Sequence, residues 1–170
     1  MQAPPLLVVM GVSGCGKSTV GSQVAAALGL DFLEGDRLHS QRNIALMSSG
    51  VALTDDDRQG WLELLSERIA QAHRNEQGLV VSCSALKRIY RDILRRGAPD
   101  LLFVHLTGHA ALLTERTARR AGHYMPASLL ASQLKTLEAP GPDEQALTFD
   151  VNDSPEVIVQ SLVAAVSQKA

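Results

Sequence analysis

The sequence predicts an α/β protein with a parallel β-sheet, and three observations carry this prediction. Short apolar runs, typical of buried strands, recur at residues 6–10, 32–34, 79–82, 101–106 and 147–151. Segments with helical spacing of apolar side chains separate these runs, and strands that alternate with helices pair in parallel. A glycine-rich segment at residues 11–18, GVSGCGKS, joins the first run to a helix. We therefore expect five parallel strands with helices on both faces.

Residues that favour helix ends mark the boundaries of several predicted helices. Gly29 and Gly97 each follow a helical pattern, at a position where a glycine in the left-handed conformation would end the helix. Ser154 can cap the last helix, because its hydroxyl can accept a backbone N–H of the first turn. Pro155 then occupies the first helical position, where the missing N–H of proline costs nothing.

A long helix is expected between residues 54 and 75. Its apolar side chains follow helical spacing at Trp61, Leu64, Leu65, Ile69 and Ala72. Three aspartates, at positions 55–57, crowd the first turn, where negative charge is favourable. For Asp55 and Asp56 we interpret this pattern as a solvated helix start. Gly60 lies inside the helix, where glycine is less favourable than alanine by about 1 kcal/mol.

Length, composition and charge limit the class of protein. The chain has 170 residues, enough for one domain over residues 1–170 that buries roughly two-thirds of its unfolded surface. A net charge of -2 leaves no basic excess for a polyanion, so a nucleic-acid partner is disfavoured. No apolar run approaches the ~20 residues of a membrane span, and residues 1–5 lack the features of a signal peptide. We therefore expect a cytoplasmic protein without a membrane partner.

The segment at residues 11–18 matches the pattern G-x-x-x-x-G-K-[ST] between a strand and a helix. Its three glycines permit backbone angles at which successive N–H groups point at one anion, and the helix adds its positive N-terminal end. On this interpretation Lys17 reaches the β- and γ-phosphates of ATP, Ser18 is a ligand of Mg²⁺, and Thr19 supports the α-phosphate. The predicted nucleotide-binding residues are Gly11, Val12, Ser13, Gly14, Cys15, Gly16, Lys17, Ser18 and Thr19.

The rest of the chain favours a small-molecule kinase over other users of this loop. Residues 57–60, DRQG, match the D-x-x-G of a GTPase switch, but no strand precedes them and no N-K-x-D element exists. The strand at residues 79–82 does not end in the acidic residue that an ATPase motor needs. A kinase requires instead an acceptor pocket, a base, and a mobile cover that excludes water.

Candidates for the base and the cover can be identified. Asp36 directly follows the second strand, at the carboxyl edge of the sheet, where it can accept the proton of an attacking hydroxyl. Arg116 and Arg120 are four residues apart on one helix face. We expect them to close over the transferring phosphoryl group and to neutralise its developing negative charge. Arg119 is interpreted as a solvated surface charge. The cover is a small mobile lid at about residues 116–130.

The chain resembles the thermoresistant gluconate kinases over nearly its whole length. The motifs that carry the resemblance are GDRLH at 35–39 with NI at 43–44, MSSGVALTDDDR at 47–58 with WL at 61–62, and CSALKRIYRD at 83–92. Residues 122–123, GH, and the stretch 133–143 containing LEAPG are also similar. The resemblance implies a three-layer P-loop NTPase fold of the nucleoside-monophosphate-kinase type, with an acceptor-binding segment at about 36–75.

The same resemblance implies the reaction of ATP with D-gluconate to give ADP and 6-phospho-D-gluconate, with Mg²⁺, commonly in a homodimer. A polyhydroxy acid needs a cation for its carboxylate and polar groups for its hydroxyls. The expected substrate-binding residues are Asp36, His39, Arg42, Asn43, Arg58, Ser84, Lys87, Arg91, His123 and Gln133. Two positions depart from the family pattern, because Leu46 stands where lysine is common and Gly60 where proline is common.

Two alternatives stay open. One is another kinase of this fold, with shikimate, adenylylsulfate or a nucleoside monophosphate as acceptor. Paired arginines beside the second strand would favour a nucleotide acceptor, and only His39 and Arg42 accompany Asp36 there. The other alternative is a non-catalytic regulator that binds ATP without turnover.

The two cysteines are expected to be free thiols. Cys15 lies beside a helix N-terminus and Lys17, an environment that favours the thiolate, so its oxidation or alkylation is predicted to block the phosphate loop. Cys83 ends the strand at 79–82, and its thiol is expected to open toward the same loop. The alternative interpretation is that Cys15 is an unreactive small residue.

Overall fold

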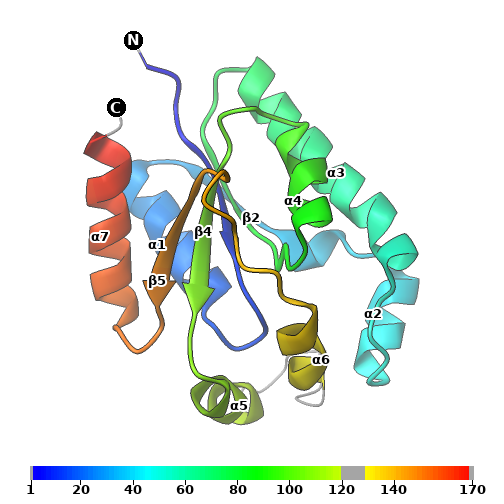
Figure 1. Ribbon diagram of the computed structural model, residues 1–170. Coiled ribbons are helices and arrows are strands. Elements are labelled where there is room, and N and C mark those ends of the chain that lie inside the picture. The colour runs from blue at the N-terminus through cyan, green and yellow to red at the C-terminus, as the bar shows by residue number, and fades with distance from the viewer. Residues whose placement is uncertain (1, 120–128, 169–170) are drawn as a thin grey trace.

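A five-stranded parallel sheet forms the centre of the computed structural model, which describes residues 2–119 and 129–168 (Figure 1). The strands are β1 (Leu6–Met10), β2 (Asp31–Glu34), β3 (Leu79–Ser82), β4 (Leu102–Thr107) and β5 (Ala146–Asp150). Their order in the sheet is β2-β3-β1-β4-β5, and every neighbouring pair is parallel. All five predicted strands are confirmed, each to within one residue at its ends.

Helices cover both faces of the sheet, as predicted. α1 (Lys17–Leu28) and α7 (Pro155–Gln168) pack together on one face, and α3 (Asp55–Arg74) and α4 (Arg88–Arg95) on the other (Figure 1). The 3₁₀ turn η1 (Gly35–Leu38) and α2 (Gln41–Ser48) connect β2 to α3. α5 (Ala110–Arg119) and α6 (Leu129–Thr136) lie beyond the carboxyl ends of the strands. This three-layer arrangement leaves the carboxyl edge of the sheet for the site.

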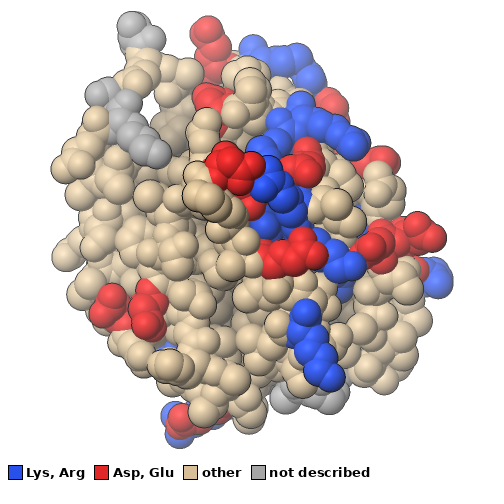
Figure 2. All heavy atoms as spheres, in the orientation of Figure 1, with Lys and Arg blue, Asp and Glu red and all other residues tan. Residues whose placement is uncertain are grey.

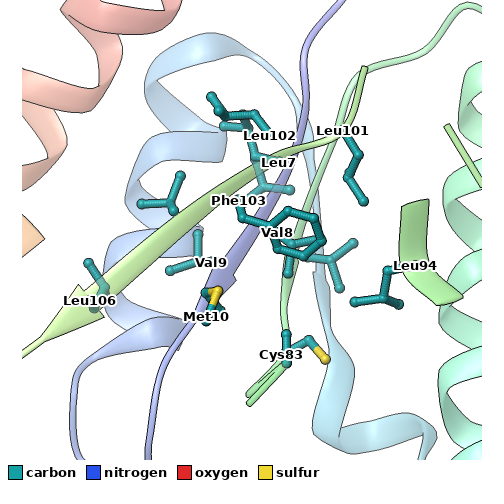
Figure 3. Close-up of a cluster of buried hydrophobic side chains, with 14 of the residues drawn as sticks. Leu7, Val8, Val9, Met10, Cys83, Leu94, Leu101, Leu102, Phe103 and Leu106 are labelled. Atoms are coloured by element: carbon teal, nitrogen blue, oxygen red, sulfur yellow. The ribbon is translucent and has the colours of Figure 1, made fainter. Parts of the chain in front are cut away.

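The core lies around the three central strands. β1, β3 and β4 are almost wholly buried, and Leu7 and Val8 of β1 lie beside Phe103 of β4 (Figure 3). The prediction that all five strands are buried is wrong for β2 and β5, whose residues are mostly half-buried or exposed. These two strands form the edges of the sheet, where a strand has a neighbour on one side only.

Helix α3 begins where the sequence indicates, but one of its predicted core positions is wrong. Thr54 caps the helix through a reciprocal pair of hydrogen bonds with Asp57. Trp61, Leu65, Ile69 and Ala72 are buried as predicted, whereas Leu64 is 54% exposed and Leu62 is buried in its place. At about 100° per residue, the other four side chains define a face that includes position 62 and excludes position 64.

The predicted helix ends are confirmed with one exception. Gly29 adopts φ 67°, the left-handed conformation expected at the end of α1. The Ser154 hydroxyl accepts the N–H of Val157 at 3.3 Å, so it caps α7. Gly97 does not adopt the left-handed conformation. α4 ends at Arg95, and the residue that follows has right-handed helical backbone angles. A Cβ at Gly97 would lie 2.5 Å from the carbonyl oxygen of Ser66 in α3, so glycine is needed there for close packing.

Charged side chains of both signs are mixed on the face of the molecule that Figure 2 shows. On α4, Arg88 pairs with Asp143 at 2.6 Å and Arg95 with Asp92 at 2.8 Å. Within residues 2–119 and 129–168, no helix has the length and apolar character needed to span a membrane.

Candidate active site

The phosphate loop connects β1 to α1 at the carboxyl edge of the sheet. Gly14 and Gly16 have φ 83° and 90°, in the left-handed region that favours glycine. A side chain at Gly14 would collide with Thr117 of α5. Gly16 is the N-cap residue of α1, and no side chain caps this helix. The first N–H groups of α1 therefore suit an anion, which is the chemistry of a triphosphate.

One cavity of about 330 Å³ brings most of the predicted site residues together. Residues 13–20 of the phosphate loop and α1 form one wall. The other lining residues are Asp36, His39, Met47, Leu53, Arg58, Trp61, Ser84, Arg116, Gln133, Val151, Asp153, Pro155 and Ile158. They come from both sides of the sheet, because α3 covers one face and α7 the other (Figure 1). The phosphate loop therefore lies between the α3 side and the α7 side of the cavity.

Lys17 stays close to the loop that contains it. Its Nζ donates a hydrogen bond to the carbonyl oxygen of Val12 at 3.1 Å and lies 4.0 Å from Sγ of Cys15. Cys15 is only 2% exposed, and this burial favours the interpretation of Cys15 as an unreactive small residue. Cys83 is fully buried, and burial raises the pKa of its thiol to about 12.

Asp36 is held by a rigid backbone on η1. The N–H of Gly35 donates to Oγ of Ser82 at 3.3 Å, and Nε1 of Trp61 donates to the carbonyl oxygen of Gly35 at 2.8 Å. No Cβ fits at Gly35, because it would collide with the carbonyl group of Ser82. Since both peptide groups of Gly35 are fixed, the adjacent Asp36 is presented to the cavity from a set position.

His39 lies against Trp61 in the same cavity. The two rings stack with centroids 3.9 Å apart and an angle of 20° between their planes. Burial, and then the nearby positive charge of Arg58, lower the pKa of His39 to about 4. The imidazole is therefore neutral at physiological pH, and it can exchange hydrogen bonds with a hydroxyl group but does not supply a positive charge.

Arg58 differs from the other predicted substrate-binding cations. It lines the cavity, and its Nη1 donates to the hydroxyl of Tyr90 at 2.9 Å. Three cations do not line the cavity, and each is paired with a carboxylate: Arg42 with Asp57 at 2.6 Å, Lys87 with Asp55 at 3.0 Å, and Arg91 with Glu144 at 2.7 Å. Substrate contacts for Arg42, Lys87 and Arg91 stay predictions, and in this structure their charges are paired within the protein, which a pattern of basic residues does not reveal.

Arg91 makes structural contacts within the protein. Its side chain is fully buried and forms two hydrogen bonds to Glu144, at 2.7 and 3.1 Å. Its Nη1 also donates to the carbonyl oxygen of Ala85 at 2.8 Å. Ala85 adopts φ 46°, a conformation that is rare outside glycine and that the Arg91 contact supports. Arg91 thus stabilises the loop between β3 and α4.

Two polar residues predicted to bind substrate make contacts within the protein. Asn43 is 3% exposed and does not line the cavity, and its Nδ2 donates to the carbonyl oxygen of Asp57 at 2.8 Å. It joins α2 to the start of α3, and its predicted substrate contact stays a prediction. Gln133 does line the cavity, but its Oε1 accepts the backbone N–H of Ser13 at 2.6 Å. Ser84, which is also predicted to bind substrate, lines the cavity.

The predicted lid residues are described in part. Arg116 lines the cavity, and its Nη2 donates to the carbonyl oxygen of Val151 at 2.9 Å. Arg119 is 77% exposed and pairs with Glu115 at 2.6 Å, which agrees with the interpretation of a surface charge. Arg120 and His123 lie outside the described residues, as does most of the predicted lid at about 116–130.

Sequence reasoning missed one side of the cavity. Val151 and Asp153 follow β5, and Pro155 and Ile158 belong to the first turn of α7. The segment was interpreted only as the end of a strand and the start of a helix, because it contains no motif with its own chemistry. A usable signal was its position, since a segment that follows a strand at the carboxyl edge of an open α/β sheet adjoins the ligand site.

Comparisons with known proteins identify the family of this chain. A family model described as shikimate kinase matches residues 13–167. The gluconokinase of Gluconobacter oxydans (strain 621H) is 46% identical over 94% of this chain and 90% of that protein. The thermoresistant gluconokinase of Escherichia coli (strain K12) is 42% identical over 96% of this chain and 94% of that protein. A gluconokinase structure from Sinorhizobium meliloti 1021 has a TM-score of 0.88 and 48% identity, covering 100% of this chain and 95% of that chain.

The fold and the phosphate loop, facing an aspartate and an arginine across one cavity, define a kinase of the P-loop class. A shikimate kinase from Acinetobacter baumannii has a TM-score of 0.59 and 18% identity, a likeness that concerns the fold alone. The chain belongs to the gluconokinase family, within the wider group that the shikimate kinase family model describes.

Proposed function

We propose that the protein transfers the γ-phosphoryl group of ATP to the 6-hydroxyl of D-gluconate, giving ADP and 6-phospho-D-gluconate. The observation that carries this proposal is the shared cavity, in which Asp36 and Arg58 face the phosphate loop. The identity of 42–46% with two gluconokinases, over nearly the whole chain, supports gluconate as the acceptor. The acceptor-binding segment is then about 36–75, since Asp36, His39, Arg58 and Trp61 all line the cavity.

In this reaction Asp36 acts as the general base. As the acceptor oxygen approaches the γ-phosphorus, its proton passes to the carboxylate of Asp36. A bond forms between that oxygen and phosphorus, the bond from phosphorus to the β,γ-bridging oxygen breaks, and ADP leaves. Lys17 and Arg116 stabilise the negative charge on the phosphoryl oxygens, and both line the cavity. The predicted second lid arginine, Arg120, is proposed to act with Arg116.

The phosphate loop fits ATP and Mg²⁺. Gly14 and Gly16 have the backbone angles of an anion cradle, and the uncapped N-terminus of α1 faces the cavity. Ser18 lines the cavity and would hold Mg²⁺ through its hydroxyl, and the ion, when bound, neutralises phosphate charge. We assign the nucleoside of ATP to the α7 side of the cavity, which includes Pro155 and Ile158.

Gluconate then binds on the α3 side of the cavity. Its carboxylate needs a cation, and among the residues that the structure describes, Arg58 lines that side of the cavity. Its hydroxyl groups need neutral donors and acceptors, which His39 and Ser84 can provide. A cytoplasmic location and a homodimeric state stay predictions from the sequence, and size-exclusion chromatography with light scattering tests the second.

A coupled assay of ADP release tests the proposed function. The purified protein is given MgATP with gluconate, shikimate, adenylylsulfate or AMP, each at the same concentration. We expect turnover with gluconate that exceeds turnover with each of the other acceptors by at least about 10²-fold. Faster turnover of shikimate or another acceptor would contradict the proposal. ATP binding without turnover of any acceptor would identify a non-catalytic regulator.

A further inference from the structure

A chain of contacts holds the Arg58 guanidinium from behind. Nη1 of Arg58 donates to the hydroxyl of Tyr90 at 2.9 Å, and that hydroxyl donates to a carboxylate oxygen of Asp55. The guanidinium carbon lies 5.2 Å from the centre of the Tyr90 ring. Asp55 and Arg58 belong to the first turn of α3, whereas Tyr90 belongs to α4. The direction of Arg58 is therefore set by a second helix.

The protonation state of Tyr90 suits this arrangement. Its side chain is buried, and burial, followed by the hydrogen bond to Asp55, raises the pKa of the phenol. The phenol thus keeps its proton, which it donates to Asp55, and its oxygen is left to accept from Arg58. Lys87 also donates to Asp55, at 3.0 and 3.2 Å, so the negative charge of Asp55 is shared and does not pair directly with Arg58.

This arrangement keeps the charge of Arg58 available to a ligand. Among the described residues, Arg58 forms no ion pair, in contrast to the neighbouring cations Arg42 and Lys87. A guanidinium has five N–H donors in a planar fork, and Tyr90 accepts from only one nitrogen. The remaining donors can bind a carboxylate with two parallel hydrogen bonds, provided that the fork is held in the right plane.

We propose that Tyr90 is a positioning residue that, anchored by Asp55, aims Arg58 at the acceptor carboxylate and so makes the enzyme prefer a sugar acid to a neutral polyol. The inference rests on the proposed function. Tyr90 does not line the cavity, so in this proposal it acts through Arg58. A neutral polyol would be bound by uncharged side chains, such as asparagine or serine. These side chains would not need such an anchor, because they carry no charge.

The test is Tyr90→Phe, which keeps the ring and removes only the hydroxyl. Losing one hydrogen bond to a charged group should raise the KM for gluconate roughly 10-fold, with kcat and the KM for MgATP within about 2-fold. Sorbitol, which has a CH₂OH group in place of the carboxylate, serves as the neutral acceptor. The preference for gluconate over sorbitol in kcat/KM should fall by the same roughly 10-fold.

Two further variants separate positioning from general damage. Arg58→Met should abolish most of the preference for gluconate, and Tyr90→Phe added to it should change nothing more, since the two residues act as one unit. Arg88→Met removes another cation of α4, which pairs with Asp143 and does not line the cavity, and should leave all parameters unchanged. Additive effects of the Tyr90 and Arg58 changes would overturn the proposal.

A binding measurement covers the case in which activity is lost for another reason. Trp61 is the single tryptophan of the chain and lines the cavity, so its fluorescence reports gluconate binding without ATP. We expect a roughly 10-fold weaker Kd for gluconate in Tyr90→Phe, with a melting temperature near that of the wild type. An unchanged Kd would disprove the inference. Failure of the wild type to phosphorylate gluconate would instead disprove the proposed function.

Discussion

The backbone N–H of Ser13, in the phosphate loop, donates a hydrogen bond to Oε1 of Gln133, in α6, at 2.6 Å. Both residues are buried. The hydroxyl of Thr117, in α5, lies 3.4 Å from the carbonyl oxygen of Ser13 and shares its proton between that oxygen and the carbonyl oxygen of Leu113, at 2.8 Å. Two helices that come late in the chain therefore hold both peptide groups of one loop residue. This contact links the shape of the phosphate loop to the position of α5 and α6.

Replacing Gln133 with alanine should lower stability and weaken nucleotide binding. The N–H of Ser13 would lose its partner in a buried place, which costs about 1–3 kcal/mol of unfolding free energy. The loop would also lose one of its two anchors, so the KM for MgATP should rise several-fold while the KM for gluconate changes little. Denaturant unfolding and steady-state kinetics measure the two effects.

Lys135→Ala is the matched control for this prediction. Lys135 is an exposed residue of the same helix, so its removal should change the unfolding free energy by less than about 0.5 kcal/mol. If the Gln133 variant were as stable as this control and bound MgATP equally well, the contact with Ser13 would have no energetic weight.

Replacing Asp36 with asparagine should remove the proposed base and keep the fold. Turnover should fall by roughly 10²- to 10⁴-fold, the usual range for a positioned general base. ATP affinity should stay within a few fold, because the phosphates are bound by the loop and Lys17. Single-turnover kinetics and a fluorescent ATP analogue measure the two quantities. A loss of ATP binding equal to the loss of rate would identify Asp36 as a nucleotide or metal-site residue.

The sequence alone was sufficient to predict the strands of the sheet and the wall of the cavity that the phosphate loop forms. Strand positions follow from apolar runs, and the phosphate loop is a contiguous segment whose chemistry depends on its own backbone. The residues around Asp36 also converge as expected, because the carboxyl ends of parallel strands share one edge. These predictions depend on local patterns and on rules that hold for every sheet of this class.

The contacts that the sequence did not reveal have a common physical origin in long-range pairing. Arg91 and Lys87 were assigned to the substrate, but Glu144 and Asp55 neutralise them from segments that are remote in sequence. Asp55 was interpreted as a solvated helix start, and its contact with Tyr90 has no local signal. A single sequence shows which residues carry charge, whereas the tertiary fold decides which of those charges remain for a ligand.

The pH dependence of stability should carry a contribution from His39. Its pKa is about 4 in the folded protein, below the ordinary value of 6.5, so between these values the unfolded chain binds a proton that the folded protein does not. Stability therefore rises with pH in this window and is lost as the pH falls. Between pH 7 and pH 5 the loss from His39 should be about 2 kcal/mol of unfolding free energy.

His39→Phe isolates this contribution, because phenylalanine can keep the stack on Trp61 and does not titrate. Burial, and then the charge of Arg91, also lower the pKa of His105, which acts in the same direction, but His105 is present in both proteins. Urea unfolding at pH 7 and pH 5 should show a smaller pH effect in the variant, by about 2 kcal/mol. An equal pH effect in both proteins would mean that His39 titrates normally.

Gly60 and Gly97 should respond in opposite ways to substitution by alanine, although both were first interpreted from helix patterns. Gly60 lies inside α3 with ordinary helical geometry, and a Cβ there would meet no atom within 4 Å. Gly60→Ala should therefore stabilise the protein by about 0.5–1 kcal/mol, since glycine loses more backbone entropy on folding. At Gly97 a Cβ would lie 2.5 Å from the carbonyl oxygen of Ser66, so Gly97→Ala should destabilise by about 1–3 kcal/mol. Thermal and denaturant unfolding of the two variants compare a helix position with free space around it and a crowded one.

A destabilised Gly60→Ala protein would mean that the start of α3 needs the flexibility of glycine. The KM for gluconate in that variant would then show whether the acceptor side of the cavity depends on this flexibility.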